Sequence, residues 1–231
     1  MHNSLKEKIA GEIVISSDPG KTMRKWREEF HISQLDLSHE LKVSASVVSD
    51  YESGRRKSPG TTMVKRYVEA LIQMEMRNGG RFIKRFDTEE KPDYLLSIRE
   101  FSSSVTLEGL MKALDAQCVS SNIGVERDLH GYTVLDSIKA ITTLGAADYL
   151  KVFGWSSQRA LIFTQVKYGR SPMIAVRAHP MKPAAVVYQR PENIDDLAIH
   201  LSKLENIPLL VSDMGIEEMI AALERIGDDG I

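Results

Sequence analysis

Residues 23–59 read MRKWREEFHISQLDLSHELKVSASVVSDYESGRRKSP, and this stretch decides the fold of the N-terminal part of the chain. Met23, Trp26 and Phe30 recur at spacings of three and four residues, as on one face of a helix. This spacing predicts a first helix over Lys21–Phe30, followed by further short helices joined by tight turns. We therefore expect an all-α domain here.

A second helix is predicted to begin after Ser33, whose hydroxyl can accept a hydrogen bond from an amide of the first helical turn. Leu37 and Leu41 stand one turn apart, so they face the same core. Lys42 and Val43 follow as a sharp turn, in which Val43 can fill the angle between two helices. Two helices that cross closely are expected at this turn.

Ser44 is expected to cap a third helix over Ala45–Ser53, and Gly54 suits the residue that follows a helix end. A fourth helix, predicted over Thr61–Met74, supplies further apolar side chains to the core. The outward face of the third helix carries short side chains that suit close approach to base edges, namely Ala45, Ser46, Ser49 and Asp50.

The quoted stretch resembles the helix-turn-helix of lambda-type repressors, Cro and the xenobiotic-response-element (XRE) regulators. The resemblance implies a five-helix domain, usually dimeric on two half-sites about one turn of double-stranded DNA apart. That family usually has glycine where Lys42 stands, so a positive φ would hold Lys42 in mild strain. The matching residues are Arg27, Ile32, Ser33-Gln34, Leu37, Leu41-Lys42-Val43-Ser44, Val48-Ser49, Glu52 and Gly54-Arg55-Arg56.

The resemblance also implies roles for individual residues. Asp50, when ionised, can only accept hydrogen bonds, which favours the cytosine N4 amine as its partner. Arg27 and Glu52 match a pair that is often buried as a structural ion pair. The base-reading residues are Ala45, Ser46, Ser49 and Asp50. The phosphate-binding residues are Ser33, Gln34, Arg55, Arg56 and Lys57.

The charge distribution agrees with a nucleic-acid partner for this part of the chain alone. Lys21–Phe86 holds 14 Lys and Arg against 8 Asp and Glu, whereas residues 87–231 hold 14 against 21. A basic front and an acidic remainder suggest that only the front meets a polyanion.

Four segments are predicted along the chain, which we expect to be α+β overall. Residues 1–20 form a short leader closed by the breaker pair Pro19-Gly20. Residues 21–78 form the helix-turn-helix domain. A helical linker over 79–130 and an α/β domain over 131–231 follow.

The linker carries two clusters of apolar residues, on helices expected near residues 93–101 and 106–117. Such amphipathic helices can form a two-fold interface, so the chain is predicted to be a homodimer. Packing between the domains of one chain is the alternative. The clusters are Leu95, Leu96, Ile98 and Phe101, and Leu107, Leu110, Met111 and Leu114.

From about Gly131, helices alternate with short apolar runs bounded by Gly or Pro, which predicts an α/β domain with a mixed sheet. This half resembles the C-terminal region of predicted archaeal regulators that carry the same N-terminal motif. Its second part weakly resembles the DRTGG sensory domain, but neither resemblance names a ligand. Helices are expected over Val134–Leu144, Ile194–Leu204 and Ile216–Ile226, and strands over Ala160–Val166, Met173–Val176, Ala184–Tyr188 and Ile207–Val211.

Three loops of this half are rich in hydroxyl and cationic groups. They are expected to converge at a strand-end crevice, where open α/β sheets tend to bind ligands. An anionic small-molecule effector would suit them. The alternative is that residues 169–172 are only a hairpin turn and Arg159 an ordinary surface charge. The candidate effector-binding residues are Trp155, Ser156, Arg159, Arg170, Ser171 and Lys182.

We expect no catalytic residue, cofactor or metal. The chain has one cysteine, Cys118, which excludes an internal disulfide and a cysteine-based zinc site. The motifs GxSxG, GxxxxGK[ST] and HExxH are missing. No apolar run of about 18 residues predicts a membrane span, and the N-terminus does not read as a secretory signal, so we expect a cytoplasmic protein.

These observations predict a homodimeric, sequence-specific DNA-binding transcription regulator, with a C-terminal domain for effector binding, dimerisation or both. One alternative is a helix-turn-helix module that bridges proteins of the transcription machinery. The other is a small-molecule enzyme with a regulatory N-terminal domain.

Overall fold

The computed structural model describes residues 3–80, 83, 92–120, 126–145 and 148–229 of the chain. It divides into two compact units, Met1–Lys91 and Pro92–Ile231. The first unit is helical and the second is built on a sheet, which confirms the expected α+β class. The functional boundaries expected at residues 20, 78 and 130 remain predictions.

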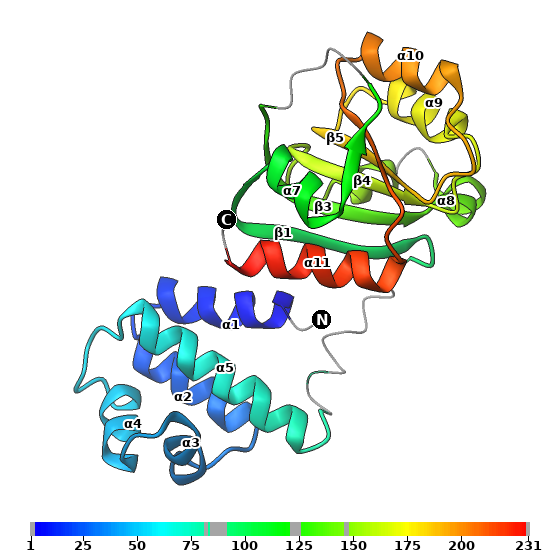
Figure 1. Cartoon of the computed structure of the whole chain (residues 1–231). Helices are drawn as coiled ribbons and strands as arrows, with labels where there is room; N and C mark the ends of the chain where they lie inside the picture. Colours follow the sequence, from blue (N-terminus) through cyan, green and yellow to red (C-terminus); the bar gives the residue numbers. More distant parts are fainter. Residues whose placement is uncertain (1–2, 81–82, 84–91, 121–125, 146–147, 230–231) are drawn as a thin grey trace. The chain divides into compact units, whose positions relative to one another are not determined.

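The first unit packs its helices around one core (Figure 1). Its described part has α1 (Asn3–Ile15), α2 (Pro19–Glu29), α3 (Gln34–Leu41), α4 (Ala45–Glu52) and α5 (Thr61–Arg77). The helices expected over Lys21–Phe30, after Ser33, over Ala45–Ser53 and over Thr61–Met74 correspond to α2, α3, α4 and α5.

The segment expected as a leader contributes α1 to that core. Leu5, Ile9 and Ile13 are buried together with Trp26 and Tyr67. The predicted breaker pair is wrong, because Pro19 and Gly20 begin α2. Proline is well suited to a first helical turn, where its missing N–H would have no partner in any case.

The start of α3 and the turn between α3 and α4 are determined by the residues that form them. Ser33 Oγ accepts a hydrogen bond from the Asp36 amide at 3.0 Å, as the N-cap prediction required. Lys42 adopts φ 54° and ψ 46°, the left-handed conformation that usually selects glycine. Ser44 precedes α4 as expected, but its hydroxyl bonds the Ser46 hydroxyl and makes no cap to the helix.

The second unit is built on a six-stranded mixed sheet with the strand order β1-β3-β4-β5-β6-β2. Strands β3 to β6 run parallel to one another, and the edge strands β1 and β2 pair antiparallel with their neighbours. The strands are β1 (Leu95–Thr106), β2 (Ala116–Cys118), β3 (Asp128–Asp136), β4 (Arg159–Thr164), β5 (Ala185–Gln189) and β6 (Leu209–Ser212).

Helices cover both faces of this sheet and make three layers (Figure 1). Alternation along the strands explains this, since Ile162 packs into one core and Leu161 and Phe163 into the other. One face is covered by α7 (Leu107–Ala113) and α11 (Ile216–Asp229). The other is covered by α8 (Ser137–Thr143), α9 (Arg170–Ala178) and α10 (Asp196–Leu204), with the 3-10 helix η1 (Asp148–Phe153) nearby.

The sequence prediction differs most from the structure in residues 79–130, which were expected to form a helical linker. The helix expected near residues 93–101 is wrong, because Leu95–Thr106 pairs with β3 as strand β1. The helix expected near 106–117 is α7 only as far as Ala113, after which β2 follows. Side chains expected to dimerise lie in the cores on the two faces of the sheet, within the second unit, which neither the dimer interface nor packing between the domains had anticipated: Leu95, Phe101, Leu107, Leu110 and Leu114.

Two further elements differ from expectation in the α/β half. The strand expected over Met173–Val176 is wrong, because these residues lie in α9 and bury one helical face. The helix expected from Val134 begins only at Ser137, since β3 extends to Asp136. Met173–Val176 is a short apolar run, which periodicity alone does not assign to helix or strand. The strands expected near β4, β5 and β6 and the helices near α10 and α11 are confirmed.

Candidate nucleic-acid interface and effector region

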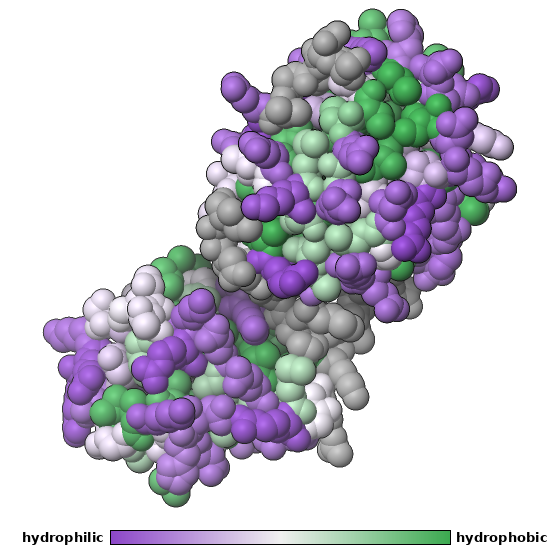
Figure 2. Space-filling model, viewed as in Figure 1, coloured by the Kyte–Doolittle hydropathy of each residue, from purple (hydrophilic) through white to green (hydrophobic). Residues whose placement is uncertain are grey.

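The outward face of α4 carries the residues predicted to read bases. Ser46 is exposed, and Ala45, Ser49 and Asp50 are partly exposed, whereas Val48 is buried against the core. The visible surface of the first unit is mostly hydrophilic (Figure 2). The helix therefore presents short, mostly polar side chains that are exposed or partly exposed to solvent.

A buried ion pair fixes this helix to the rest of its unit. Arg27 Nε donates to Glu52 Oε1 at 2.7 Å, and Arg27 Nη2 donates to Oε2 at 2.8 Å. The Gln34 amide donates to Oε2 and the Tyr67 hydroxyl to Oε1, each at 2.8 Å. The four side chains come from α2, α4, α3 and α5, so one carboxylate ties four helices together.

The charges of this cluster are stabilised by its hydrogen bonds. Burial by itself would raise the pKa of Glu52, but the bonds from Arg27, Gln34 and Tyr67 outweigh burial and hold that pKa below its usual value. Burial and the adjacent carboxylate raise the pKa of Tyr67, so its hydroxyl remains a donor. Glu52 is therefore ionised at neutral pH.

The sequence suggested Gln34 as a phosphate ligand and did not reveal its bond to Glu52. A carboxamide has two N–H donors, and Gln34 is partly exposed. The bond to Glu52 orients the amide and leaves its second hydrogen for another acceptor. Ser33, at the same helix start, is exposed.

The residues after α4 form an exposed basic segment. Arg55, Arg56 and Lys57 are all exposed. Arg55 Nη1 donates to Asp50 Oδ1 at 3.2 Å, which joins a predicted phosphate ligand to a predicted base reader. The Arg56 guanidinium lies over the Tyr51 ring, 5.3 Å from its centroid. Both arginines are therefore held beside α4 by weak surface contacts.

Gly20 is a structural residue of this interface that the sequence pattern did not reveal. A Cβ at this position would lie 2.2 Å from the Tyr51 carbonyl oxygen, a distance that backbone atoms cannot tolerate. Glycine thus lets the start of α2 approach the end of α4. In the sequence this glycine reads as part of a breaker pair, because the close approach of two helices leaves no local signal.

Comparison with known proteins identifies the family. A family model described as helix-turn-helix matches residues 23–72, which reach from α2 into α5. An uncharacterized HTH-type transcriptional regulator of Methanocaldococcus jannaschii is 41% identical over 224 residues, covering 94% of this chain and 92% of its own. One of Archaeoglobus fulgidus is 39% identical over 226 residues, covering 96% and 97%. The chain belongs to the HTH-type transcriptional regulators.

The similarity between the regulator and these relatives reaches well beyond the helix-turn-helix. Because it runs over nearly the whole of each chain, the α/β unit accompanies the XRE-type helix-turn-helix in the relatives as well. No solved structure matches the regulator.

The described residues of the regulator hold no group of three His, Cys, Asp or Glu side chains that could bind a metal ion. No helix in the same ranges has the length and apolar character needed to cross a membrane. Acidic residues stand at the starts of two helices of the second unit, where carboxylates stabilise the helix end. Asp195 accepts from the Leu197 amide at 2.9 Å as the N-cap of α10, and Glu217 and Glu218 lie in the first turn of α11.

The regulator does not bring the predicted effector residues together. Trp155, Ser156 and Arg159 lie at or before the start of β4, and Lys182 precedes β5. Arg170 and Ser171 follow β4, so they lie at the opposite ends of the parallel strands, where these strands have their carboxyl ends. The expected convergence is wrong because a helix, α9, crosses between two parallel strands and places alternate loops at opposite ends.

Two of these residues have structural partners. Arg159 is fully buried, donates to the Ser156 carbonyl oxygen at 2.7 Å and to Thr133 Oγ1 at 3.0 Å, and forms an ion pair with Glu100. Burial lowers the pKa of Arg159, and Glu100 opposes that shift. Lys182 Nζ donates to the Arg177 carbonyl oxygen at 2.7 Å, at the end of α9.

The other four differ in their surroundings. Trp155 is 94% exposed, and its amide donates to Glu100 Oε1 at 3.0 Å. Ser156 is partly buried beside Arg159. Arg170 and Ser171 begin α9, so residues 169–172 are a helix start and not the hairpin turn of the alternative. These two alone lie at the sheet edge where parallel strands end.

Proposed function

We propose that the regulator reads a specific double-stranded DNA sequence by placing α4 in the major groove. The observation that carries this proposal is the face of α4, where short side chains are exposed and three exposed cations follow at once. A helix of this kind fits the groove, and Ser46, Ser49 and Asp50 would then meet base edges.

Phosphate contacts would flank that helix on both sides. Gln34, oriented by Glu52, and Ser33 stand at the start of α3, where amide N–H groups favour an anion. Arg55, Arg56 and Lys57 stand after α4. Arg55 would exchange its bond with Asp50 for a phosphate, which would free the Asp50 carboxylate to accept from a cytosine.

Selection of binding sites from random double-stranded DNA, followed by footprinting, tests this function. The Arg55→Ala/Arg56→Ala double variant should bind the selected site and random DNA more weakly by similar factors. The slope of log affinity against log salt should shrink by about 0.9 for each DNA phosphate that the variant no longer neutralises. The matched control removes Lys203 and Arg225, which are exposed cations of the acidic unit, and should leave affinity and slope unchanged.

An Asp50→Ala variant separates base reading from electrostatic attraction. It should relax the preference at one base pair and retain the salt slope. An unchanged preference at every position, or no selected sequence at all, would favour a protein-bridging role for the helix-turn-helix.

We further propose that the regulator acts as a homodimer and that its α/β unit senses a small molecule. A dimer would place two copies of α4 on half-sites one DNA turn apart, and the footprint length and light scattering measure this. Support for sensing comes from Arg170 and Ser171 at the carboxyl edge of the sheet, where α/β folds commonly bind ligands.

A further inference from the structure

A crevice opens between α8 and α9, beyond the ends of β3 and β4. It consists of a cavity of about 290 Å³ and an adjoining one of about 360 Å³, which share Ser137, Ile141, Ser171 and Pro172 in their linings. Together these volumes fall in the range of ~300–1,000 Å³ that small-molecule sites occupy. The crevice is therefore large enough for a small ligand.

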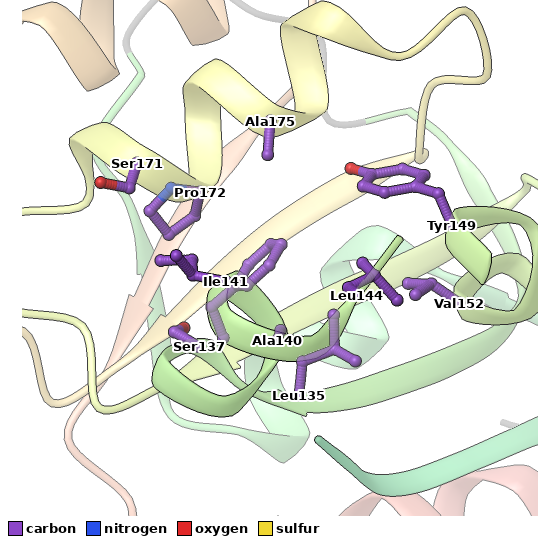
Figure 3. Close-up of a pocket in the computed structure, with 11 residues that line it drawn as sticks. Leu135, Ser137, Ala140, Ile141, Leu144, Tyr149, Val152, Ser171, Pro172 and Ala175 are labelled. Carbon is purple, nitrogen blue, oxygen red and sulfur yellow. The ribbon is translucent and has the colours of Figure 1, made fainter. Parts of the chain in front are cut away.

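One end of the crevice is apolar (Figure 3). Side chains of α8 and α9 face each other across it, and Tyr149 stands at the end away from Ser137 and Ser171. Tyr149 is held there by stacking on His179, with ring centroids 4.2 Å apart. The apolar lining comprises Leu135, Ala140, Ile141, Leu144, Val152, Phe163, Pro172 and Ala175.

The other end carries a polar group that the fold leaves unused. Ser137 is 5% exposed, and its Oγ has no hydrogen-bond partner among the described residues, although the side chain lines both cavities. A buried hydroxyl without a partner loses its hydration and gains nothing in return. A ligand oxygen in the crevice would supply the missing bond.

The start of α9 lies at this same polar end. Gly169 precedes the helix with φ 74° and has no side chain to cap it, and Pro172 contributes no N–H. The amides of Arg170 and Ser171 occupy the first two helical positions, where N–H groups lack helical acceptors and favour an anion.

The cations around this end are paired with carboxylates of the same unit. Lys167 and Arg170 line it together with one carboxylate, Asp195, which accepts from Arg170 at 2.5 Å, and Lys167 Nζ lies 3.6 Å from Glu192 Oε1. Asp136, next to Ser137, is occupied as well: it accepts from the Ile138 and Lys139 amides and from Gln165. Asp195 is therefore neutralised by Arg170, whereas Asp136 is held by neutral donors, so the preference for an anion rests on the amides at the start of α9 and on the Ser137 hydroxyl.

We propose that the crevice binds a small amphipathic carboxylic acid, with its apolar body between α8 and α9 and its carboxylate at Ser137 and the start of α9. This inference deepens the sensing role proposed above and rests on it. It names the site and the chemical class of the effector. The acid can be aliphatic or aromatic, since the apolar lining accepts either.

Isothermal titration calorimetry on the full chain without DNA tests the proposal, so a failure of DNA reading would not affect the result. The probes are octanoate, 3-phenylpropanoate and octanamide, which keeps the aliphatic body but lacks the charge. We expect one molecule of acid per chain, with octanamide at least tenfold weaker than octanoate. Equal affinity for octanoate and octanamide, or no binding of either acid, would overturn the proposal.

Two variants place the ligand in the crevice. Ser137→Ala should weaken octanoate binding about tenfold or more, because the ligand carboxylate would have one hydrogen-bond donor fewer. The unliganded protein should keep its stability, since this hydroxyl has no partner among the described residues. The matched control is Ser202→Ala, a buried serine whose hydroxyl donates to the Ile199 carbonyl oxygen outside the crevice and whose removal should leave binding intact.

Ala175→Phe should fill the apolar end and abolish binding of both acids while circular dichroism shows an unchanged fold. Retained binding in this variant, or full affinity in Ser137→Ala, would show that the acid binds elsewhere. Binding seen only together with a change of oligomeric state in light scattering would assign the crevice to a second copy of the chain, and would also overturn the proposal.

Discussion

Replacing Glu52 by glutamine should destabilise the helical unit by about 3–5 kcal/mol, because the change leaves the buried Arg27 guanidinium without its counter-charge. The two side chains are 9% and 1% exposed, so solvent offers little screening. Glutamine keeps one acceptor oxygen where Glu52 accepts four hydrogen bonds. Its NH₂ group would also face the N–H groups of Arg27.

The assay can follow the helical unit alone because the chain has two tryptophans, one in each unit. Trp26 is 4% exposed, whereas Trp155 is 94% exposed. In a Trp155→Phe background, urea unfolding followed by tryptophan fluorescence reports the surroundings of Trp26. The matched control is Arg24→Ala, which removes an exposed ion pair with Glu28 of 2.7 Å and should change the free energy of unfolding little, because solvent screens the pair.

The same pair predicts a dependence on pH. The pKa of Glu52 is lower in the folded unit than in the unfolded chain. The ionised carboxylate therefore contributes fully to the stability of the fold when the pH is above the pKa of the unfolded state, and this contribution is lost as the pH falls through the pKa of the folded state. Stability should therefore decline below about pH 4.3, the ordinary pKa of glutamate, and Glu52→Gln should reduce that decline. A cost of Glu52→Gln below about 1 kcal/mol at neutral pH would refute the argument.

Two further changes test backbone conformation. Lys42→Gly should stabilise the helical unit by about 0.5–1 kcal/mol in urea unfolding, because Lys42 is exposed and holds a left-handed φ of 54° that strains any residue with a Cβ. A decrease in stability would show that Lys42 is not strained. Gly169→Ala should destabilise the α/β unit by about 2–4 kcal/mol, because the new Cβ would lie 2.1 Å from the Tyr188 ring at φ 74°. The midpoint of thermal unfolding measures this loss. The control Gly215→Ala, whose new Cβ would have no atom within 4 Å, should change that midpoint little, and equal effects of the two changes would show that the Tyr188 ring does not exclude a side chain at residue 169.

Much of the helix-turn-helix was readable from the chain because its signals are local. The cap at Ser33 and the left-handed turn at Lys42 each depend on residues within one or two helical turns. The pairing of Arg27 with Glu52 spans 25 residues and came from the family resemblance, not from spacing. The bonds from Gln34 and Tyr67 to the same carboxylate were missed, because no local pattern shows which helices meet.

The candidate effector site was not predictable in the same way. The sequence pointed to Arg170 and Ser171 but grouped them with Arg159, whose partner Glu100 is 59 residues away. Ser137 gave no signal at all, since an unpartnered hydroxyl is defined only by what surrounds it. Reading Met173–Val176 as a strand also hid the helix that separates the loops.

The sequence by itself determined the helix-turn-helix, the register of α4 and the existence of a mixed α/β sheet, because helix periodicity, caps and turn residues act over a few neighbours. Only the tertiary structure decided that residues 95–106 are a strand, since their pairing with β3 is a contact between distant segments. It also decided that Arg159 is buried and that Ser137 faces a crevice. Burial and pairing depend on every element that packs nearby, and this information is not contained in any short stretch of the chain.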